Sequence, residues 1–555
     1  MQNSITERLT TLLREALDRA GLPTSEDIAW EVPREESHGD YATNSALTLA
    51  RAARKPPRQI AEAIKASFPH SPMVVRLDVA GPGFLNVFLA PDWCAEALKG
   101  ILADGAAYGT GRAGQGKRFL LEFVSANPTG PLVIVNARAA AVGDALARIL
   151  RAQGNAVESQ YYVNDAGNQF QALAQSVDVR LRQALGEAAE LPENSYPGEY
   201  LIELVAKWLA ADPAGMRKLA ALPVEERIER LGRMAVSDMV AGQRAVLEAY
   251  GTRFDSWAHE DADVRQRGLP EKVIAELMAA GHTYVEDGAL WFRSTAFGDD
   301  KDRVLRKSDG ELTYFGVDIA FHHMGKLARA DWAIDFLGPD HHGYVQRMKA
   351  AMAALGHPGD RYDALIVQLV TLLRDGQPVR MSKRRGEFVL MEELIEEVGR
   401  DAARFTFLTR RHDSPLDFDL AVATRQSSDN PVFYVQYAHA RVSSLFRTAS
   451  EQHIAIPPWD QVDFRPLSVP EEQTIIKRLL QYPSLVAGAA RAREPHRVAY
   501  YLTELAGLYH PYYKSRRVIT EDRALTLARL GLAAAVGQVV RNGLELLGVS
   551  APETM

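Results

Sequence analysis

Residues 118–131, Arg-Phe-Leu-Leu-Glu-Phe-Val-Ser-Ala-Asn-Pro-Thr-Gly-Pro, decide the fold class of this chain. The first seven form a largely apolar run of the kind that a buried parallel strand shows. A turn with Gly and Pro follows and leads into a helical pattern over 136–153. A strand, a turn and a helix in this order open α/β sheets that bind nucleotides, because the N–H groups at the start of the helix attract phosphate. The stretch therefore predicts an α/β core.

The sequence downstream of this stretch continues the same core. Residues 157–163, 332–337 and 364–370 have the composition of further strands, with helical patterns between them. The stretch from about 175 to 290 is charged and helical. We interpret it as a helical insertion into the α/β core.

The two ends of the chain predict separate domains. Apolar residues from Ile5 to Leu17 recur with helical spacing, and residues 74–77 and 84–88 read as short strands around a Gly-Pro-Gly turn. Beyond residue 420 the pattern is that of amphipathic helices rich in Tyr, Leu and Arg. We therefore predict a multidomain α/β protein with an N-terminal α+β domain and a C-terminal all-α bundle. The predicted boundaries are 1–110, 111–420 and 421–555.

Composition narrows the class of protein. Of the 555 residues, 47% are hydrophobic and 24% charged, so the chain can bury a large core. A single cysteine, Cys94, excludes a disulfide framework and a multi-cysteine zinc or iron–sulfur site. The first residues do not resemble a signal peptide, and no stretch approaches the ~18 uncharged apolar residues of a membrane span. We expect a soluble cytoplasmic protein without a membrane partner.

Two loops carry residues suited to chemistry on phosphates or other ligands. Lys383 lies in the basic loop 379–386, Val-Arg-Met-Ser-Lys-Arg-Arg-Gly, where its cation could stabilise charge on a polyphosphate. Taken alone, this loop reads more simply as a solvated basic turn. Residues 338–343, Gly-Pro-Asp-His-His-Gly, follow a predicted strand, where ligands of α/β sheets collect. No second cluster accompanies this Asp-His-His run, so we expect no protein-held metal.

Together these segments resemble the arginyl-tRNA synthetases, a family of class I aminoacyl-tRNA synthetases. Residues 125–132 resemble the lead-in to the first signature of that family, and Met381-Ser-Lys383 resembles its second, the KMSKS loop. Further family-like segments occur in order along nearly the whole chain. They are 37–40, 80–83, 161–168, 430–439 and 541–549.

The resemblance implies a fold and an activity. It implies a Rossmann-like catalytic core, an N-terminal domain that recognises the tRNA elbow and a C-terminal anticodon-binding bundle. The implied reaction is that of an arginine–tRNA ligase, which activates L-arginine with ATP and Mg²⁺ to arginyl-adenylate. The arginyl group then passes to the 3′ end of tRNA(Arg). The family suggests a monomer.

The resemblance also implies roles for individual residues. Arginine presents a guanidinium with five donors, so its pocket needs carboxylates and other acceptors. Tyr314 and Asp318 are four residues apart and would share one helix face. The resemblance implies that these two residues bind the guanidinium and that Glu122 and Asn127 bind the α-amino end of arginine. The full arginine set is Glu122, Ser125, Asn127, Tyr314, Asp318, Asp340 and His342. The ATP set is Gly130, Pro131, Asn136, Gln368, Met381, Ser382 and Lys383, of which Lys383 and Asn136 are the catalytic candidates.

One departure from the family affects the ATP half of the site. Where the family has His-x-Gly-His, this chain has Val133-Ile-Val-Asn136. Loss of such a hydrogen-bond donor typically costs ~3 kcal/mol of transition-state stabilisation. Asn136 retains one amide in the place of the second histidine, whereas Val135 adds bulk in place of the glycine. We expect that Arg138 could supply a compensating phosphate contact.

The C-terminal bundle carries the candidate tRNA contacts. Aromatic residues and cations alternate in two segments there, a combination that stacks on unpaired bases and neutralises phosphates. The candidates are Tyr434, Tyr437, Arg441, Tyr509, Tyr513, Lys514 and Arg517. Two alternatives to the ligase stay open at this point. One is a catalytically impaired tRNA-binding or regulatory paralogue, and the other is an arginine-activating enzyme with a different acceptor.

Overall fold

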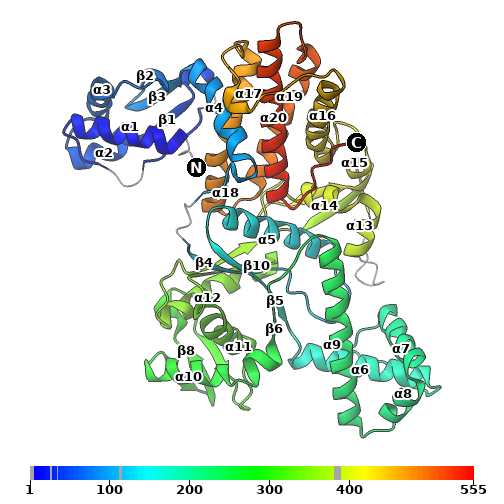
Figure 1. The fold of residues 1–555 in the computed structure, drawn as a ribbon. Helices are drawn as coiled ribbons and strands as arrows, with labels where there is room; N and C mark the ends of the chain where they lie inside the picture. Colours follow the sequence, from blue (N-terminus) through cyan, green and yellow to red (C-terminus); the bar gives the residue numbers. More distant parts are fainter. Residues whose placement is uncertain (1–4, 25–27, 34, 112–115, 380–388) are drawn as a thin grey trace.

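The computed structural model describes residues 5–24, 28–33, 35–111, 116–379 and 389–555. Figure 1 shows an N-terminal domain beside the long helices of the C-terminal bundle, and a central sheet region from which a helical arm projects. The fold class predicted from the sequence is confirmed.

The N-terminal domain packs helices on a small antiparallel sheet. Its strands are β1 (Tyr41–Thr43), β2 (Val74–Ala80) and β3 (Phe84–Leu89), in the order β1-β3-β2. Its helices are α1 (Ile5–Arg19), α2 (Ser45–Ala53), α3 (Pro57–Ser67) and α4 (Pro91–Asp104). Leu9, Leu13 and Leu17 recur at intervals of four residues, so α1 buries one apolar stripe as its sequence predicts.

The core is a five-stranded sheet in which every neighbouring pair is parallel. Its order is β11 (Tyr362–Ile366), β10 (Trp332–Leu337), β4 (Arg118–Glu122), β5 (Ala156–Val163), β6 (Ser256–His259). Helix α5 (Ile134–Ala152) follows β4 and is buried along most of its length. The predicted strand–turn–helix unit is thus confirmed and lies at the centre of the sheet.

The stretch from about 175 to 290, which we expected to be a helical insertion, is only partly helical. An arm of four helices leaves the sheet after β5: α6 (Gly167–Ala184), α7 (Glu199–Ala211), α8 (Pro213–Ala220) and α9 (Val224–Ala249). The chain then returns to add β6 to the parallel sheet. Helix α10 (Leu269–Ala279) and an antiparallel sheet of β7 (Thr283–Glu286), β8 (Ala289–Phe292) and β9 (Arg303–Arg306) follow. These strands have four residues each, which is too short for an alternating pattern to stand out in the sequence.

The second half of the α/β region runs from α11 to α15. Helix α11 (Tyr314–Ala320) continues into the π-helix η5 (Phe321–Leu327), and α12 (His342–Ala354) follows β10. The expected strand 364–370 divides into β11 and β12 (Val370–Arg374), with a break between them. The other elements here are β13 (Gln377–Pro378), α13 (Met391–Val398), α14 (Arg400–Phe407), β14 (Leu416–Asp419) and α15 (Leu420–Thr424).

The C-terminal bundle consists of long helices, as predicted. They are α16 (Pro431–Glu451), α17 (Pro470–Leu480), α18 (Tyr482–Ala492), α19 (His496–Ser515) and α20 (Arg523–Leu546). Among the described residues, only α20 is long and apolar enough to cross a membrane by length and composition, but 67% of its most apolar window is buried inside the protein. Burial among the other helices accounts for that composition.

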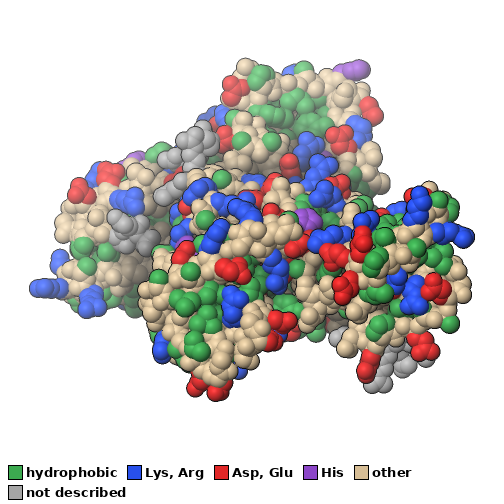
Figure 2. Space-filling view, turned by 90° about the horizontal axis from the view of Figure 1, so that it is seen from below, with side chains coloured by type: hydrophobic (Ala, Val, Ile, Leu, Met, Phe, Trp, Pro, Cys, Tyr) green, Lys and Arg blue, Asp and Glu red, His purple; other side chains and the backbone are tan. Residues whose placement is uncertain are grey.

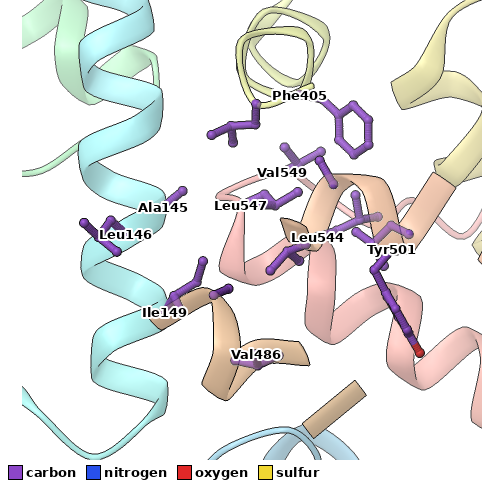
Figure 3. Close-up of a cluster of buried hydrophobic side chains, with 14 of the residues drawn as sticks. Ala145, Leu146, Ile149, Phe405, Val486, Tyr501, Leu544, Leu547 and Val549 are labelled. Atoms are coloured by element: carbon purple, nitrogen blue, oxygen red, sulfur yellow. The ribbon is translucent and has the colours of Figure 1, made fainter. Parts of the chain in front are cut away.

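The bundle and the sheet share one apolar core at α5. Figure 3 shows Ala145 and Ile149 of α5 on the side toward Leu544 and Leu547 from the end of α20. The two domains therefore bury apolar side chains against each other along α5.

A fully buried arginine, Arg404 of α14, reinforces this junction. It donates to Asp144 of α5, to the carbonyls of Tyr250 and Leu547 at 3.2 Å each, and to Thr252 Oγ1 at 3.0 Å. One side chain thereby connects α5, the end of the helical arm and the end of α20.

Candidate nucleotide and amino-acid site

The carboxyl ends of the parallel strands lie at one edge of the sheet, where ligands of α/β folds bind. Glu122 ends β4 and pairs in register with Asp335 of β10. Asp340 and Gln368 follow β10 and β11. The structure therefore brings these predicted residues to one edge, although they are up to 246 positions apart in sequence. Figure 2 shows the molecule from below the view of Figure 1. Lys and Arg side chains, with Asp and Glu among them, run across the middle of the surface that is seen there.

The turn after β4 has an unusual backbone. Val124 and Ser125 have φ values of 69° and 36°, in the left-handed region that non-glycine residues seldom adopt. Ser125 Oγ accepts a hydrogen bond from the Tyr162 N–H at 3.0 Å, which fixes the turn against β5. Strained backbone of this kind persists where surrounding contacts enforce it, often at functional sites.

The rest of the turn is held from the helical arm. The Gln243 side chain on α9 donates to the carbonyls of Asn127 at 3.2 Å and Gly130 at 2.9 Å. Tyr200 on α7 donates its hydroxyl to Thr129 O at 2.5 Å. Sequence reasoning missed Gln243 and Tyr200, because nothing local marks a residue in the arm as a contact of a distant turn.

A group of carboxylates gives this edge of the sheet its charge. Burial is the main reason that the pKa of the Tyr162 hydroxyl is raised. The nearby carboxylates of Glu260, Asp318 and Glu122 raise it further. Tyr162 itself donates to Glu260 at 3.1 Å. Glu122 also pairs with Lys326 at 2.6 Å and Glu260 with Arg265 at 2.7 Å, so part of this negative charge is offset within the protein. The remaining carboxylate charge favours a positively charged ligand. The sequence pointed to Glu122 and Asp318 but missed Glu260 and Tyr162.

Asp318 is the carboxylate with the most perturbed protonation in this group. Its only described side-chain partner is the Tyr344 hydroxyl, which donates to it at 3.0 Å. Burial raises its pKa from 3.8 to about 6, with His322 opposing and the neighbouring Glu260 and Glu122 adding to the rise. Tyr314, one helical turn earlier, is 53% exposed and available to a ligand. A bound guanidinium would supply the cation that this carboxylate lacks.

This pKa predicts a pH dependence for the arginine binding that the resemblance implies at Asp318. Below pH 6 Asp318 is protonated and loses its attraction for a guanidinium, so we expect the KM for arginine to rise as the pH falls from 7 to 5. Initial-rate measurements across this range check the expectation. Asp318→Asn should raise KM at every pH and remove most of the dependence. A wild-type KM that stays constant from pH 7 to 5 would contradict it.

Two of the predicted arginine residues have weaker structural support. The Asp340 side chain is 80% exposed, and its nearest partner is His341 at 3.5 Å. Asn127 is also exposed, on the turn after β4. His342 begins α12, and its side chain lies outside what the structure describes.

The start of α5 is tied to the residues that follow the second signature. Met391 N–H donates to Leu132 O at 2.9 Å, and Ile134 N–H donates to Val389 O at 3.2 Å. The Asn136 side-chain oxygen accepts the Val133 N–H at 2.9 Å, which leaves its NH₂ group as the available donor. Met381, Ser382 and Lys383 themselves lie outside the described residues.

The expectation that Arg138 contacts phosphate is wrong. Arg138 is fully buried and donates to four backbone carbonyls, those of Gln368 at 2.8 Å, Leu369 at 3.3 Å, Arg411 at 2.9 Å and Ser414 at 2.8 Å. Burial lowers its pKa to about 10. Its guanidinium joins α5 to the segments before β12 and β14, so it is not available to a ligand.

The candidate tRNA residues divide into exposed and buried sets. Arg441 lies over the rings of Tyr437 at 4.4 Å and Tyr513 at 5.4 Å, and it also donates to His510 Nδ1 at 3.0 Å. Tyr437 is exposed, as are Lys514 and Arg517, whereas Tyr434 is half-buried. These residues remain candidates for nucleic-acid contact.

Tyr509 is a correction to that set. It is fully buried in the bundle, and burial raises the pKa of its hydroxyl well above the ordinary value. A side chain with no exposed surface cannot stack on a base. Its position on α19 places it on the face that packs into the core, whereas Tyr513, one turn later, is half-buried.

Three family models match the chain. They are the arginyl tRNA synthetase N terminal domain at residues 7–89, the class I (R) tRNA synthetase catalytic domain at 229–419 and the DALR anticodon binding domain at 435–555. The strand β4 and the turn after it lie upstream of the catalytic-domain match.

Individual proteins match over nearly the full length. The arginine–tRNA ligase of Symbiobacterium thermophilum is 46% identical over 95% of this chain and 94% of its own. That of Desulfosudis oleivorans is 44% identical over the whole of both chains. The Thermus thermophilus arginyl-tRNA synthetase structure superposes with a TM-score of 0.78 at 25% identity, covering 99% of this chain and 100% of that one.

Proposed function

Because the chain belongs to the arginyl-tRNA synthetase family, it is an arginine–tRNA ligase, and we propose how its residues perform this reaction. The observation that carries the proposal is the group of carboxylates, Glu122, Asp318 and Glu260, that lies around Tyr162 near the carboxyl ends of the parallel strands. L-Arginine brings two cations, an ammonium and a guanidinium. Glu122 faces the first of these and Asp318, with Tyr314, the second.

In the activation step, a carboxylate oxygen of arginine attacks the α-phosphorus of ATP and pyrophosphate leaves. Lys383 stabilises the charge on the leaving pyrophosphate, and the NH₂ group of Asn136 donates to the phosphate that is attacked. Gln368, Gly130 and Pro131 border the nucleotide. Mg²⁺ would be carried by the phosphate oxygens of ATP, which are ligands that this ion prefers, and would offset the negative charge of the phosphates.

In the transfer step, a ribose hydroxyl at the 3′ end of tRNA(Arg) attacks the carbonyl carbon of arginyl-adenylate and AMP leaves. The N-terminal domain contacts the tRNA elbow, and the bundle contacts the anticodon loop through the Tyr437–Arg441–Tyr513 surface. We propose that the enzyme acts as a monomer in the cytoplasm.

The altered first signature predicts a specific behaviour of Asn136 variants. Asn136→Asp keeps the oxygen that accepts the Val133 N–H but replaces the donor with a negative charge beside phosphate. We expect it to lower kcat about 10²-fold, with the melting temperature unchanged. Asn136→Ala should lower both kcat and stability, the latter by about 1 kcal/mol. Equal kcat values for the wild type and Asn136→Asp would show that the amide does not act on phosphate.

The function is tested by charging tRNA(Arg) with labelled arginine and ATP. Clear charging that a Glu122→Gln, Asp318→Asn double variant abolishes supports both the activity and the pocket. Tight tRNA binding without charging would instead mean that the Val-Ile-Val-Asn segment has ended catalysis. Charging by the double variant at the wild-type KM for arginine would place the amino acid elsewhere.

A further inference from the structure

A buried lysine outside the predicted site touches the residue proposed to bind the α-ammonium of arginine. Lys326 lies in the π-helix η5 and is 0% exposed. Its Nζ lies 2.6 Å from Glu122 Oε2, 2.6 Å from Asp335 Oδ1 and 3.1 Å from His322 Nε2. A charge taken fully out of water is retained only where close partners offset the loss of hydration. The carboxylates therefore stabilise the buried charge of Lys326, and Lys326 stabilises theirs.

The carboxylate of Asp335 is fully engaged in this cluster. Its Oδ1 contacts Lys326, and its Oδ2 contacts His322 Nε2 at 2.6 Å and the Tyr362 hydroxyl at 3.1 Å. Burial alone would raise the pKa of Asp335, but Lys326 and His322 hold it well below its usual range. Asp335 thus stays charged, and its oxygens are occupied by donors from the protein.

Glu122 differs from Asp335 because, among the described residues, only its Oε2 has a hydrogen-bonded or ionic partner. Its Oε2 is held by Lys326, and its side chain retains 15% exposure at the end of β4. A carboxylate fixed at one oxygen presents the other in a defined direction. The cluster also reaches the other end of the pocket, because His322 Nδ1 donates to the backbone carbonyl of Asp318 at 2.7 Å.

We propose that Lys326 is a positioning residue for arginine: it fixes Glu122 through Oε2 so that Oε1 receives the α-ammonium. This inference rests on the proposed role of Glu122. Lys326 itself does not touch the substrate.

The test separates the ammonium from the rest of the ligand. L-Arginine is compared with 5-guanidinopentanoate, which keeps the guanidinium and the carboxylate but lacks the α-ammonium. The measurements are the KM of arginine in tRNA charging and the inhibition constant of the analogue in the same assay. Lys326→Met removes the charge at similar length, and Lys349→Met on α12, whose lysine pairs with Asp363 at 3.2 Å, serves as the matched control.

We expect Lys326→Met to raise the KM of arginine about tenfold or more while the inhibition constant of the analogue changes less than about twofold. Glu122→Gln should show the same pattern, Lys326→Arg should restore part of the loss, and Lys349→Met should resemble the wild type. Equal weakening of both ligands in Lys326→Met would overturn the proposal in favour of a general structural role. If Glu122→Gln itself shows no arginine-specific loss, the proposed function of Glu122 fails instead.

A second variant covers the case in which Lys326→Met does not fold because Asp335 is left buried and unpaired. The double variant Lys326→Met, Asp335→Asn removes both charges of the buried pair. It should show the same arginine-specific rise in KM. Equal KM values for this double variant and an Asp335→Asn single variant would also overturn the proposal.

Discussion

Lys383→Ala is expected to lower kcat for tRNA charging by about 10²–10³-fold, with a much smaller change in the KM for arginine. The lysine is proposed to act on the leaving pyrophosphate, whose charge develops only as the α-phosphorus is attacked. Removing it therefore raises the barrier of the activation step without removing contacts to the amino acid. The measurement is steady-state charging together with the ATP–pyrophosphate exchange rate.

Two further variants show whether the loss of kcat comes from the charge of Lys383. Arg374→Ala removes one cation from β12, where it pairs with Glu397 at 2.7 Å, and should leave kcat near the wild-type value. Lys383→Arg keeps the charge and should retain more activity than Lys383→Ala. If Lys383→Ala lowers kcat less than about tenfold, another group stabilises the pyrophosphate and the proposed role of the second signature is wrong.

Arg404→Met is expected to lower the free energy of unfolding by about 3–5 kcal/mol. The substitution leaves the Asp144 carboxylate, only 6% exposed, with Arg148 at 2.8 Å as its remaining cation, and it removes the two hydrogen bonds that Arg404 donates to the Leu547 carbonyl. Urea denaturation followed by tryptophan fluorescence measures the effect. The loss should appear in the transition that reports on both the catalytic core and the bundle, because Arg404 connects them.

The matched control is Arg400→Met, four residues earlier on the same helix. Arg400 is exposed and pairs with Asp401 at 3.1 Å, so its removal should cost less than about 1 kcal/mol. Similar losses in the two variants would mean that the buried contacts of Arg404 contribute no more than those of a surface ion pair.

The parts of the fold that could be predicted are the elements whose apolar residues follow a recognisable local pattern. The apolar run 118–124 and the helical pattern after it predicted β4 and α5 because burial imposes a composition on each element. The four-residue strands β6 to β9 could not be predicted, since they form through pairing with distant partners and carry too few residues for a period.

The candidate site divides in the same way. Glu122 and Asp318 could be chosen because they belong to motifs, and the structure places both near the carboxyl ends of the parallel strands. Lys326 could not be chosen, because its importance comes from three contacts that only the folded chain creates. Tyr509 and Arg138 failed for the converse reason: their residue types suit nucleic acid and phosphate, but burial withdraws them from any ligand.

The hydrogen bonds from Tyr200 and Gln243 to the turn after β4 bear on how this enzyme can be recombined with its relatives. The arm that carries these side chains has the outline of an exchangeable module, joined to the sheet at its two ends. Yet the turn depends on it for the support of Asn127, Thr129 and Gly130. A chimaera that takes the arm from one parent and the turn from another would inherit mismatched halves of one contact. The functional unit of exchange is the arm together with the turn.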